Sequence, residues 1–536
     1  MKKLIIYSVI ILGVLLTACS EKPQPSANDA TNTTEARETN QLTLAIGGEP
    51  EQGFDPTTGW GRYGSPLFQS TLLSENADLE VTHDLATDYQ VSDDGQKWAV
   101  TLRKDAVFSD GEPLTADDVV FTYETAKQAQ SVVDVANLEK VEKNSNYEVT
   151  FYLKEPQSTF IHTLQTLGIV PKHAYDSDYA ENPVGSGPYK IVEWRKGEQL
   201  IVERNPHYYG EQPAFDQLTF LFMGEDQAIA AAKAGEIDVL SVPITSADQS
   251  IDGMNRISLE SVDNRGVMLP YPEPTTNEEG EKVGNGITSS LAIRQAMNYA
   301  VNREEIVEGV LNGEGTVAFS SVDGLPWGTS KAVIEDNNQV KAEEILKNAG
   351  WKRENDGIFE KDGQKASLTL YYPSGDQMRQ SLSLVFADQM NDFGIEITTK
   401  SASWNEIEKQ MYSNPVMMGW GSHNPIELYS LYHSSMQGID YYNANYYHNE
   451  KVDNYLDQAL NAKTEKEANE YWKLAQWDGS TGLSAVGDAP WVWLVNLNHI
   501  YYINENLKIG EQKVQPHGHG WPITDFITEW QLQQDG

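Results

Sequence analysis

The sequence contains almost no cysteine and comparatively few basic residues. Its 536 residues include a single cysteine, Cys19, so no disulfide can form within the chain. Acidic residues number 79 against 39 lysines and arginines, which gives a formal net charge of −40. Such a charge repels nucleic acid, so we expect no DNA or RNA partner. A net charge of this size is typical of a soluble secreted surface. The more specific alternative is that the charge creates an electrostatic field that attracts cations.

The sequence also lacks an apolar run long enough to cross a bilayer, which takes about 20 residues. The apolar run over residues 4–16 follows two lysines and is typical of a secretion signal. The string Leu16-Thr17-Ala18-Cys19 resembles the lipobox at which bacterial lipoproteins are cleaved and acylated. We therefore predict a signal peptide over residues 1–18 and an extracytoplasmic protein held on the cell membrane by lipid on Cys19. A stray buried cysteine is the alternative.

The segment after Cys19 lacks large apolar residues. Residues 20–40 contain no aliphatic side chain larger than alanine, so this segment cannot bury enough apolar surface to fold. We predict a disordered tether over residues 19–40. The rest of the chain is long enough for about three domains.

Three motifs of catalytic or phosphate-binding sites are missing: Gly-x-Ser-x-Gly, His-Glu-x-x-His and Gly-x4-Gly-Lys-Ser/Thr. We therefore expect a binding protein and no enzymatic activity. The alternative from a different class is an extracellular hydrolase or carbohydrate-binding enzyme. It is suggested only by the content of 13 tryptophans and 26 tyrosines.

Strand-like and helix-like segments alternate along the chain, which favours an α/β fold. Alternating apolar and polar residues predict strands over residues 42–46, 98–102 and 147–153. Capping residues and helical spacing predict a helix that starts at Thr115, one long helix over residues 291–311, and a helix over residues 341–348 that Gly350 ends.

Several short strings occur in order between residues 42 and 500. They are Phe54-Asp55-Pro56, VFSDGEPLTADDV (107–119), GSGPY (185–189), RNPHYY (204–209) and the segment 293–303. Most of them are structural, since a turn uses the conformational freedom of Gly185 and Gly187. Together they resemble the substrate-binding proteins of peptide and nickel ABC importers, which form solute-binding protein family 5.

This resemblance implies a fold, a set of domains and a set of partners. The fold is a two-lobe periplasmic-binding-protein-like α/β fold of class II type with an extra subdomain on the first lobe. The implied lobe I comprises residues 41–58, 180–275 and 500–536, the extra subdomain residues 59–179, and lobe II residues 276–499. The chain is expected to be a monomer whose lobes close on a solute and deliver it to an ABC permease with its ATPase.

The segment PHGHGWP (516–522) carries two histidines that suggest a metal. Gly518 and Gly520 allow a tight loop to turn both imidazoles of His517 and His519 toward one point. Imidazole suits nickel, copper and zinc. The loop resembles the two-histidine prong of nickel-binding members, so nickel with a small chelator such as histidine is the leading solute. An unliganded polar loop, and an oligopeptide as the solute, are the alternatives.

Four further residues are candidate ligand contacts. His423 stands where peptide-binding members have an acid in a Gly-Trp-x-x-Asp string. This difference favours a metal complex over a peptide as the solute. Trp420 and Trp521 offer surfaces for stacking, and core packing is the alternative for both. Arg265 is a candidate partner for a ligand carboxylate, and a salt bridge within the protein is the alternative.

Overall fold

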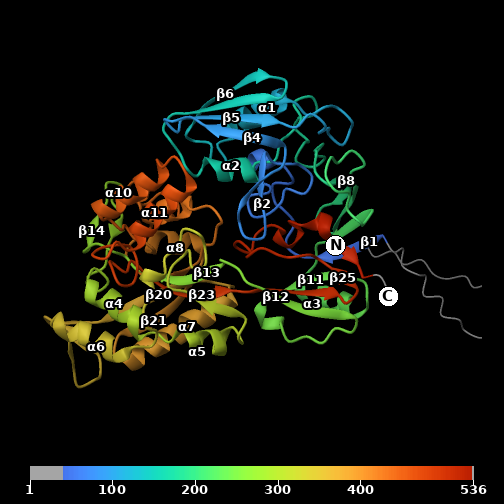
Figure 1. Cartoon of the computed structure of the whole chain (residues 1–536). Coiled ribbons are helices and arrows are strands. Elements are labelled where there is room, and N and C mark those ends of the chain that lie inside the picture. Colours follow the sequence, from blue (N-terminus) through green and yellow to red (C-terminus); the bar gives the residue numbers. More distant parts are fainter. Residues whose placement is uncertain (1–39, 534–536) are drawn as a thin grey trace, which may run out of the picture. The chain divides into compact units, whose positions relative to one another are not determined.

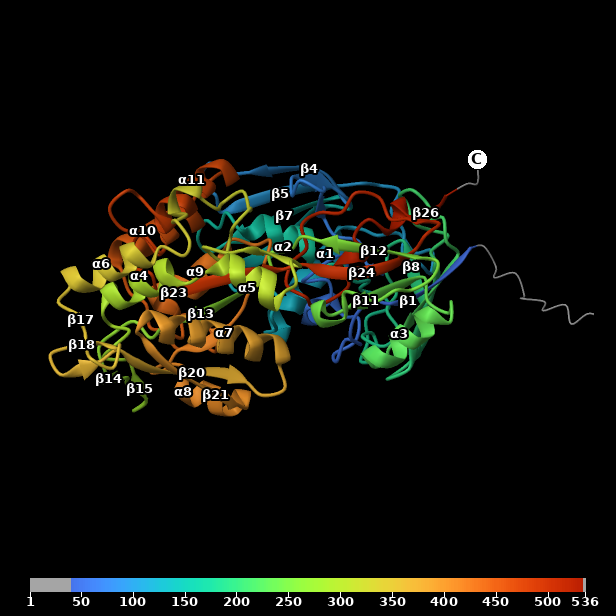
Figure 2. The same ribbon diagram turned by 90° about the horizontal axis from the view of Figure 1, so that it is seen from below.

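The computed structural model describes residues 40–533, and two large sheets organise this part of the chain (Figure 1). The seven-stranded sheet has the order β12-β24-β11-β1-β10-β9-β8. Its strands are β1 (Gln41–Ala45), β8 (Tyr189–Arg195), β9 (Gln199–Arg204), β10 (Gln217–Leu221), β11 (Val239–Val242), β12 (Met254–Leu259) and β24 (His499–Asn504). β1 lies parallel to β10 and β11. The helix α3 (Glu225–Lys233) links β10 to β11 and packs on β11 (Figure 2).

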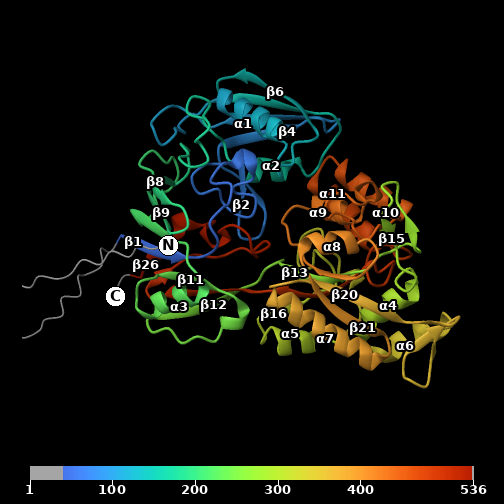
Figure 3. The ribbon, with the colours of Figure 1, turned by 180° about the vertical axis from the view of Figure 1, so that it is seen from behind.

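The six-stranded sheet has the order β16-β23-β13-β22-β20-β21. Its strands are β13 (Asn264–Met268), β16 (Gly315–Val317), β20 (Ser367–Pro373), β21 (Glu396–Ala402), β22 (Val416–Met418) and β23 (Trp491–Leu497). The helices that pack on its strands (Figure 3) include α4 (Leu291–Ala300), α5 (Arg303–Val310) and α7 (Gln377–Phe393). The other helices of this region are α6 (Gln339–Asn348), α8 (Trp404–Gln410), α9 (Ile426–Tyr432), α10 (Glu450–Leu460) and α11 (Glu465–Gln476).

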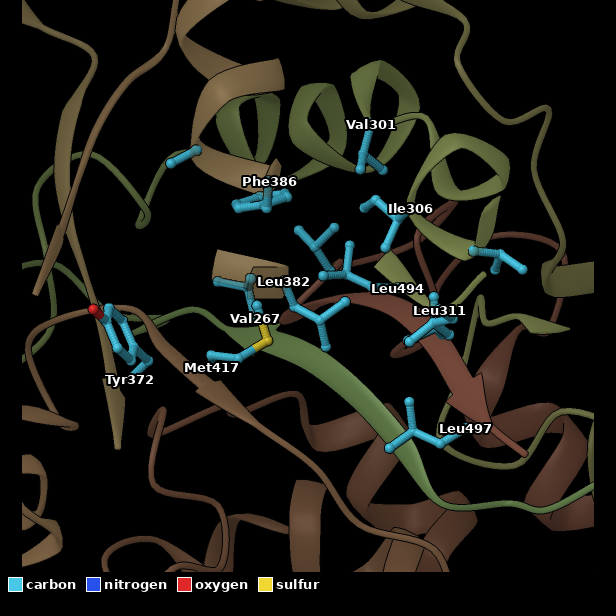
Figure 4. Packing of buried hydrophobic residues seen from close by; sticks show 14 of the residues in the cluster. Val267, Val301, Ile306, Leu311, Tyr372, Leu382, Phe386, Met417, Leu494 and Leu497 are labelled. Atoms are coloured by element: carbon cyan, nitrogen blue, oxygen red, sulfur yellow. The ribbon is translucent and has the colours of Figure 1, made fainter. Parts of the chain in front are cut away.

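Successive residues of β23 enter two different cores, because side chains alternate between the two faces of a strand. Val492 and Leu494 belong to the core with α4, α5 and α7, part of which Figure 4 shows around Leu494 and Phe386. Trp491 and Trp493 belong to the opposite core, with α9, α10 and α11. All seven residues of β23 are therefore buried. Truncating the fully buried Phe386 to alanine is expected to cost about 3–5 kcal/mol.

A four-stranded sheet has its own core. It has the order β4-β5-β7-β6 and comprises β4 (Ala86–Val91), β5 (Lys97–Leu102), β6 (Leu138–Ser145) and β7 (Glu148–Leu153), with α1 (Ala116–Ala129) and α2 (Phe160–Thr166) packed against it. Thr115 and Asp118 form a reciprocal capping box at the start of α1, which confirms the predicted helix start. The smaller strands are β2 (Leu73–Glu75), β3 (Val81–His83), β14 (Thr275–Thr276), β15 (Lys282–Val283), β17 (Lys352–Arg353), β18 (Phe359–Lys361), β19 (Gln364–Lys365), β25 (Leu507–Lys508) and β26 (Gln531–Leu532).

The prediction of one long helix over residues 291–311 is wrong, because the segment forms α4 and α5. Val301 is extended, and the side chain of Asn302 accepts a hydrogen bond from the N–H of Glu305, which starts a new helix. The break also places the guanidinium of Arg303 in the core, where it donates to the carbonyls of Ala318 and Trp493. The other predicted strands and helices are confirmed to within two residues.

The chain passes from the seven-stranded to the six-stranded sheet between β12 and β13, and returns between β23 and β24. The predicted domain boundaries stay predictions. The predicted signal peptide, Cys19 and residues 19–39 of the predicted tether lie outside the described residues. Within residues 40–533, no helix has the length and apolar character needed to span a membrane.

Candidate functional site

Three segments meet where the chain passes between the two large sheets, and we call this region the junction: residues 260–265, 419–421 and 515–519. Three backbone hydrogen bonds of 2.8 to 2.9 Å join the segments: Val262 N–H to Gln515 O, Asn264 N–H to Trp420 O, and His517 N–H to Gly421 O. The two-histidine loop is thus fastened directly to the loop that precedes His423.

The imidazoles of His517 and His519 lie face to face, with ring centroids 4.6 Å apart and ring planes at 16°. The N–H of His519 donates to the carbonyl of His517 (2.6 Å), which closes a tight turn. Gly520 has a left-handed φ of +73°, and Gly518 has no positive φ, so the backbone favours glycine at position 520 and not at position 518. The ring of Tyr63 lies 6.3 and 5.6 Å from the two imidazoles. The structure therefore brings the two predicted metal ligands together.

The surroundings of both imidazoles favour their neutral form. Burial lowers the pKa of His517 to about 4, although the carboxylate of Asp263, 3.4 Å from its Nε2, acts in the opposite direction. Partial burial and the nearby guanidinium of Arg265 lower the pKa of His519. Within residues 40–533, Nδ1 of His517 is buried and has no hydrogen-bond partner. A neutral imidazole with a free lone pair is the form that binds a metal.

Asp263 is the buried anion of the junction. Its carboxylate binds the guanidinium of Arg265, and its Oδ2 lies 3.6 Å from Nε2 of His499. Burial alone would raise the pKa of Asp263, but Arg265, His517 and His499 hold it well below its ordinary value. The salt bridge named as the alternative for Arg265 is present, on the second residue of β13. The contact of Arg265 with a ligand carboxylate stays a prediction.

Two further guanidinium groups lie near the histidine pair, and the sequence did not indicate them. Arg62 lies over the ring of Tyr63, 5.0 Å from its centroid. Arg379, in the first turn of α7, binds Asp376, and its buried Nε has no partner among the described residues. The positive charges of Arg62 and Arg379 contribute to the lowered pKa of His519. Such a cluster suits a ligand that carries a carboxylate.

A cavity of about 460 Å³ adjoins the junction. Its walls include Arg62, Tyr63, Glu75, His162, His423 and Lys513. Nδ1 of His423 lies 3.3 Å from Oε1 of Glu75, while its buried Nε2 has no partner within the described range. Burial lowers the pKa of His162 to about 4, so this wall presents neutral imidazole. The predicted contact residue His423 thus lines this cavity.

Lys513 ties one wall of this cavity together. Its Nζ lies 2.6 Å from Glu75 and 2.7 Å from Asp525. Burial by itself would raise the pKa of Glu75, but the hydrogen bond with His423 and the charge of Lys513 hold that pKa far below its ordinary value. The wall therefore contains a fixed network of charges.

The two predicted tryptophans differ in their surroundings. Trp521 is 3% exposed and stacks on Phe220, with ring centroids 4.3 Å apart, within the core of the seven-stranded sheet. Trp420 is half-buried and stacks on Tyr442 at 5.5 Å. Core packing accounts for Trp521, and ligand contact stays a prediction for both tryptophans.

Residues 59–64 have the spacing Gly-x-Gly-x-x-Gly, which marks a dinucleotide site only between a strand and a helix. Here the spacing follows the 3-10 helix η1 (Pro56–Thr58), and no helix begins directly after it. The loop instead supplies Arg62 and Tyr63 to the cavity wall.

The described part of the chain does not by itself complete a metal site. Across residues 40–533, no three His, Cys, Asp or Glu side chains are arranged to hold a metal ion together. His517 and His519 provide at most two ligands, so a bound metal needs donor atoms from its own chelator.

Comparisons with known proteins now define the family. Residues 80–441 match the family model described as bacterial extracellular solute-binding proteins, family 5 Middle. The chain is 33% identical over 508 residues to Protein XP55 of Streptomyces lividans, with 91% of this chain and 88% of that protein covered. It is 29% identical over 548 residues to the oligopeptide-binding protein AppA of Bacillus subtilis (strain 168), with 93% and 94% covered.

A solved structure gives the same result. NikZ from Campylobacter jejuni in complex with Ni(L-His) is 26% identical, has a TM-score of 0.75, and is matched over 92% of this chain and 99% of that chain. The predicted two-lobe α/β fold with an extra subdomain is confirmed. Proteins of this kind work with an ABC permease and its ATPase and are not enzymes. The chain belongs to family 5 of the bacterial extracellular solute-binding proteins and is the solute-binding protein of an ABC importer for peptides or nickel.

Proposed function

We propose that this protein captures nickel, or a similar transition-metal ion, as a complex with a small chelator such as histidine. The observation that carries the proposal is the pair of facing imidazoles of His517 and His519, 4.6 Å apart, with Nδ1 of His517 unpartnered among residues 40–533. A relative of the same fold was solved with Ni(L-His), which supports a metal chelate as the cargo.

The surrounding charges suit the chelator as well as the metal. The imidazoles supply borderline nitrogen donors, and the chelator supplies the remaining ligands. Arg62 and Arg379 stand near the histidine pair and would neutralise the carboxylate of a chelator such as histidine. The predicted contact Arg265 is tied to Asp263, so we assign it to the support of the loop.

Capture proceeds by closure of the two lobes. The site takes His517 from the segment after β24 and Arg379 from α7, which packs on the six-stranded sheet. A ligand that contacts both sides stabilises the closed state by its differential affinity. We further propose that a monomer, tethered through lipid on Cys19, presents the cargo to the permease.

A calorimetric titration tests the proposal. Protein stripped with a chelating agent is titrated with nickel(II) and L-histidine, and the midpoint of thermal unfolding is measured alongside. We expect binding that the double variant H517A/H519A abolishes, and that the exposed-histidine control H207A retains. Equal binding by the wild type and by H517A/H519A would exclude the loop as the nickel site.

The second candidate solute is an oligopeptide, favoured by the identity to AppA over 93% of the chain. A peptide would occupy the cavity of about 460 Å³ and continue along the junction. Mass spectrometry of material that co-purifies with the protein distinguishes the two candidates, because only this one predicts bound peptides.

A further inference from the structure

A buried glutamate lies under the loop that holds the two-histidine segment. Glu427, the second residue of α9, is 8% exposed. Its Oε2 accepts a hydrogen bond of 3.1 Å from the N–H of Gly421. Its buried Oε1 has no hydrogen-bond partner in the part of the chain that the structure describes. Burying an ionised carboxyl group without an ion pair costs free energy, and burying the neutral form costs less.

The residue that Glu427 binds also holds the histidine loop. The carbonyl of Gly421 accepts a hydrogen bond of 2.8 Å from the N–H of His517. Gly421 has φ +146°, and a Cβ there would lie 2.3 Å from the carbonyl oxygen of Val262, so no other residue fits. One peptide group on each side of Gly421 thus connects the carboxyl of Glu427 to the backbone of His517.

We propose that Glu427 is a positioning residue for the solute site, which holds the two-histidine loop in place through Gly421. The assignment rests on the proposed function for its consequence in nickel capture, but the connection itself does not require nickel. Glu427 touches no ligand in this scheme. It fixes His517 by fixing the peptide to which His517 is bound.

Burial favours the neutral form of Glu427, and the charged groups that face it act in both directions. Arg62 and Tyr63 face it from the loop after η1, Asp263 faces it from the junction, and Tyr432 lies on its own helix. Burial, together with the negative charge of Asp263, raises the pKa of Glu427 to about 8, although the N–H of Gly421 and the charge of Arg62 oppose this. Near pH 7 glutamine therefore matches glutamate in shape, in charge and in its acceptor oxygen.

Two variants test the inference in the full-length protein. In E427L the acceptor is lost, and we expect hydrogen–deuterium exchange over residues 515–519 to accelerate about tenfold, the effect of one lost hydrogen bond. E427Q keeps the acceptor and is expected to stay within about twofold of the wild type at pH 7. Unchanged exchange in E427L, or equal acceleration in both variants, would overturn the inference.

Calorimetry with nickel and L-histidine measures how the two substitutions change the affinity for the proposed solute. We expect E427L to bind about tenfold more weakly than the wild type and E427Q to bind equally at pH 7. Where E427L does not fold, E427M takes its place, because methionine has a similar size and no acceptor oxygen for the N–H of Gly421. Exchange over residues 515–519 in E427M that equals that of the wild type would overturn the inference. If the wild type binds no nickel, only the proposed function is contradicted. The role of Glu427 is still tested by the exchange measurement, which does not require nickel.

Discussion

The carboxylate of Asp263 lies 3.4 Å from Nε2 of His517 and at the same time binds the guanidinium of Arg265. This single buried anion therefore supports one candidate metal ligand and neutralises one cation of the junction. Asp263 lies between β12 and β13, where the chain passes from one large sheet to the other, so it connects the site to both sheets.

Replacing Asp263 by asparagine leaves the buried Arg265 without its counter-charge. We expect D263N to lose about 3–5 kcal/mol of the free energy of unfolding, the usual effect of breaking a buried pair from one side. Urea denaturation measures this loss. The exposed control D78N is expected to change stability by less than about 0.5 kcal/mol, and a loss as small in D263N would show that the pair is not needed.

The protonation of His517 is expected to occur far below that of an ordinary histidine. Because its pKa is lowered to about 4, the folded protein binds fewer protons than the unfolded chain between pH 4 and about 6.5, so His517 lowers stability as pH falls through that window. An NMR titration, with H517A to assign the resonance, should place its midpoint near pH 4. A midpoint near 6.5 would mean that the ring is not buried.

Lys513 separates two carboxylates in the cavity wall. We expect K513M to destabilise the protein by about 3–5 kcal/mol at pH 7, because Glu75 and Asp525 then face each other without a cation. Without the charge of Lys513 the pKa of Glu75 rises in the variant, so the deficit should shrink as pH falls from 7 to 4. Thermal unfolding across this range checks the prediction, with the exposed-lysine variant K172M as control. A deficit independent of pH would contradict it.

Two glycines of the junction should respond differently to alanine. Gly421 has a positive φ and no room for a Cβ, so G421A is expected to cost about 2 kcal/mol or more and to weaken solute binding. Gly518 has no positive φ, and a Cβ there would lie no closer than 3.4 Å to Asp263, so G518A should cost less than about 1 kcal/mol. Urea denaturation of both variants measures the two losses of stability, and equal losses would contradict the prediction.

Glu427 should make stability depend on pH in a defined direction. With its pKa raised from 4.5 to about 8, the folded protein binds more protons than the unfolded chain between these values. Its contribution is therefore present below pH 4.5 and is lost as pH rises toward 8. We expect the advantage of E427Q over the wild type to grow by on the order of 3 kcal/mol between pH 5 and pH 8. A constant difference would contradict the buried, protonated state.

The sequence was a good guide wherever the signal is local. Thr115 and Asp118 are three residues apart, and their capping box is a property of one helical turn. The alternation in residues 98–102 likewise follows from one strand with one buried face. The missed break at Asn302 also had a local signal, because asparagine followed three residues later by Glu305 is a helix start.

The environment of the histidine pair was beyond the sequence. His517 and His519 are two residues apart in the sequence, but Tyr63, Asp263 and Arg379 reach them only through tertiary folding. The buried state of Glu427 was hidden for the same reason, since a glutamate in the first turn of a helix ordinarily faces solvent. Burial and charge, which set the pKa values of the site, are properties of the assembled fold.

X-ray absorption at the nickel edge tests the central claim most directly, on stripped protein loaded with one equivalent of nickel(II) and L-histidine. The account predicts imidazole scattering from protein histidines beyond that of the free nickel–histidine complex, present in the wild type and absent in H517A/H519A. A spectrum identical in the two proteins, or identical to the complex in buffer, would contradict it.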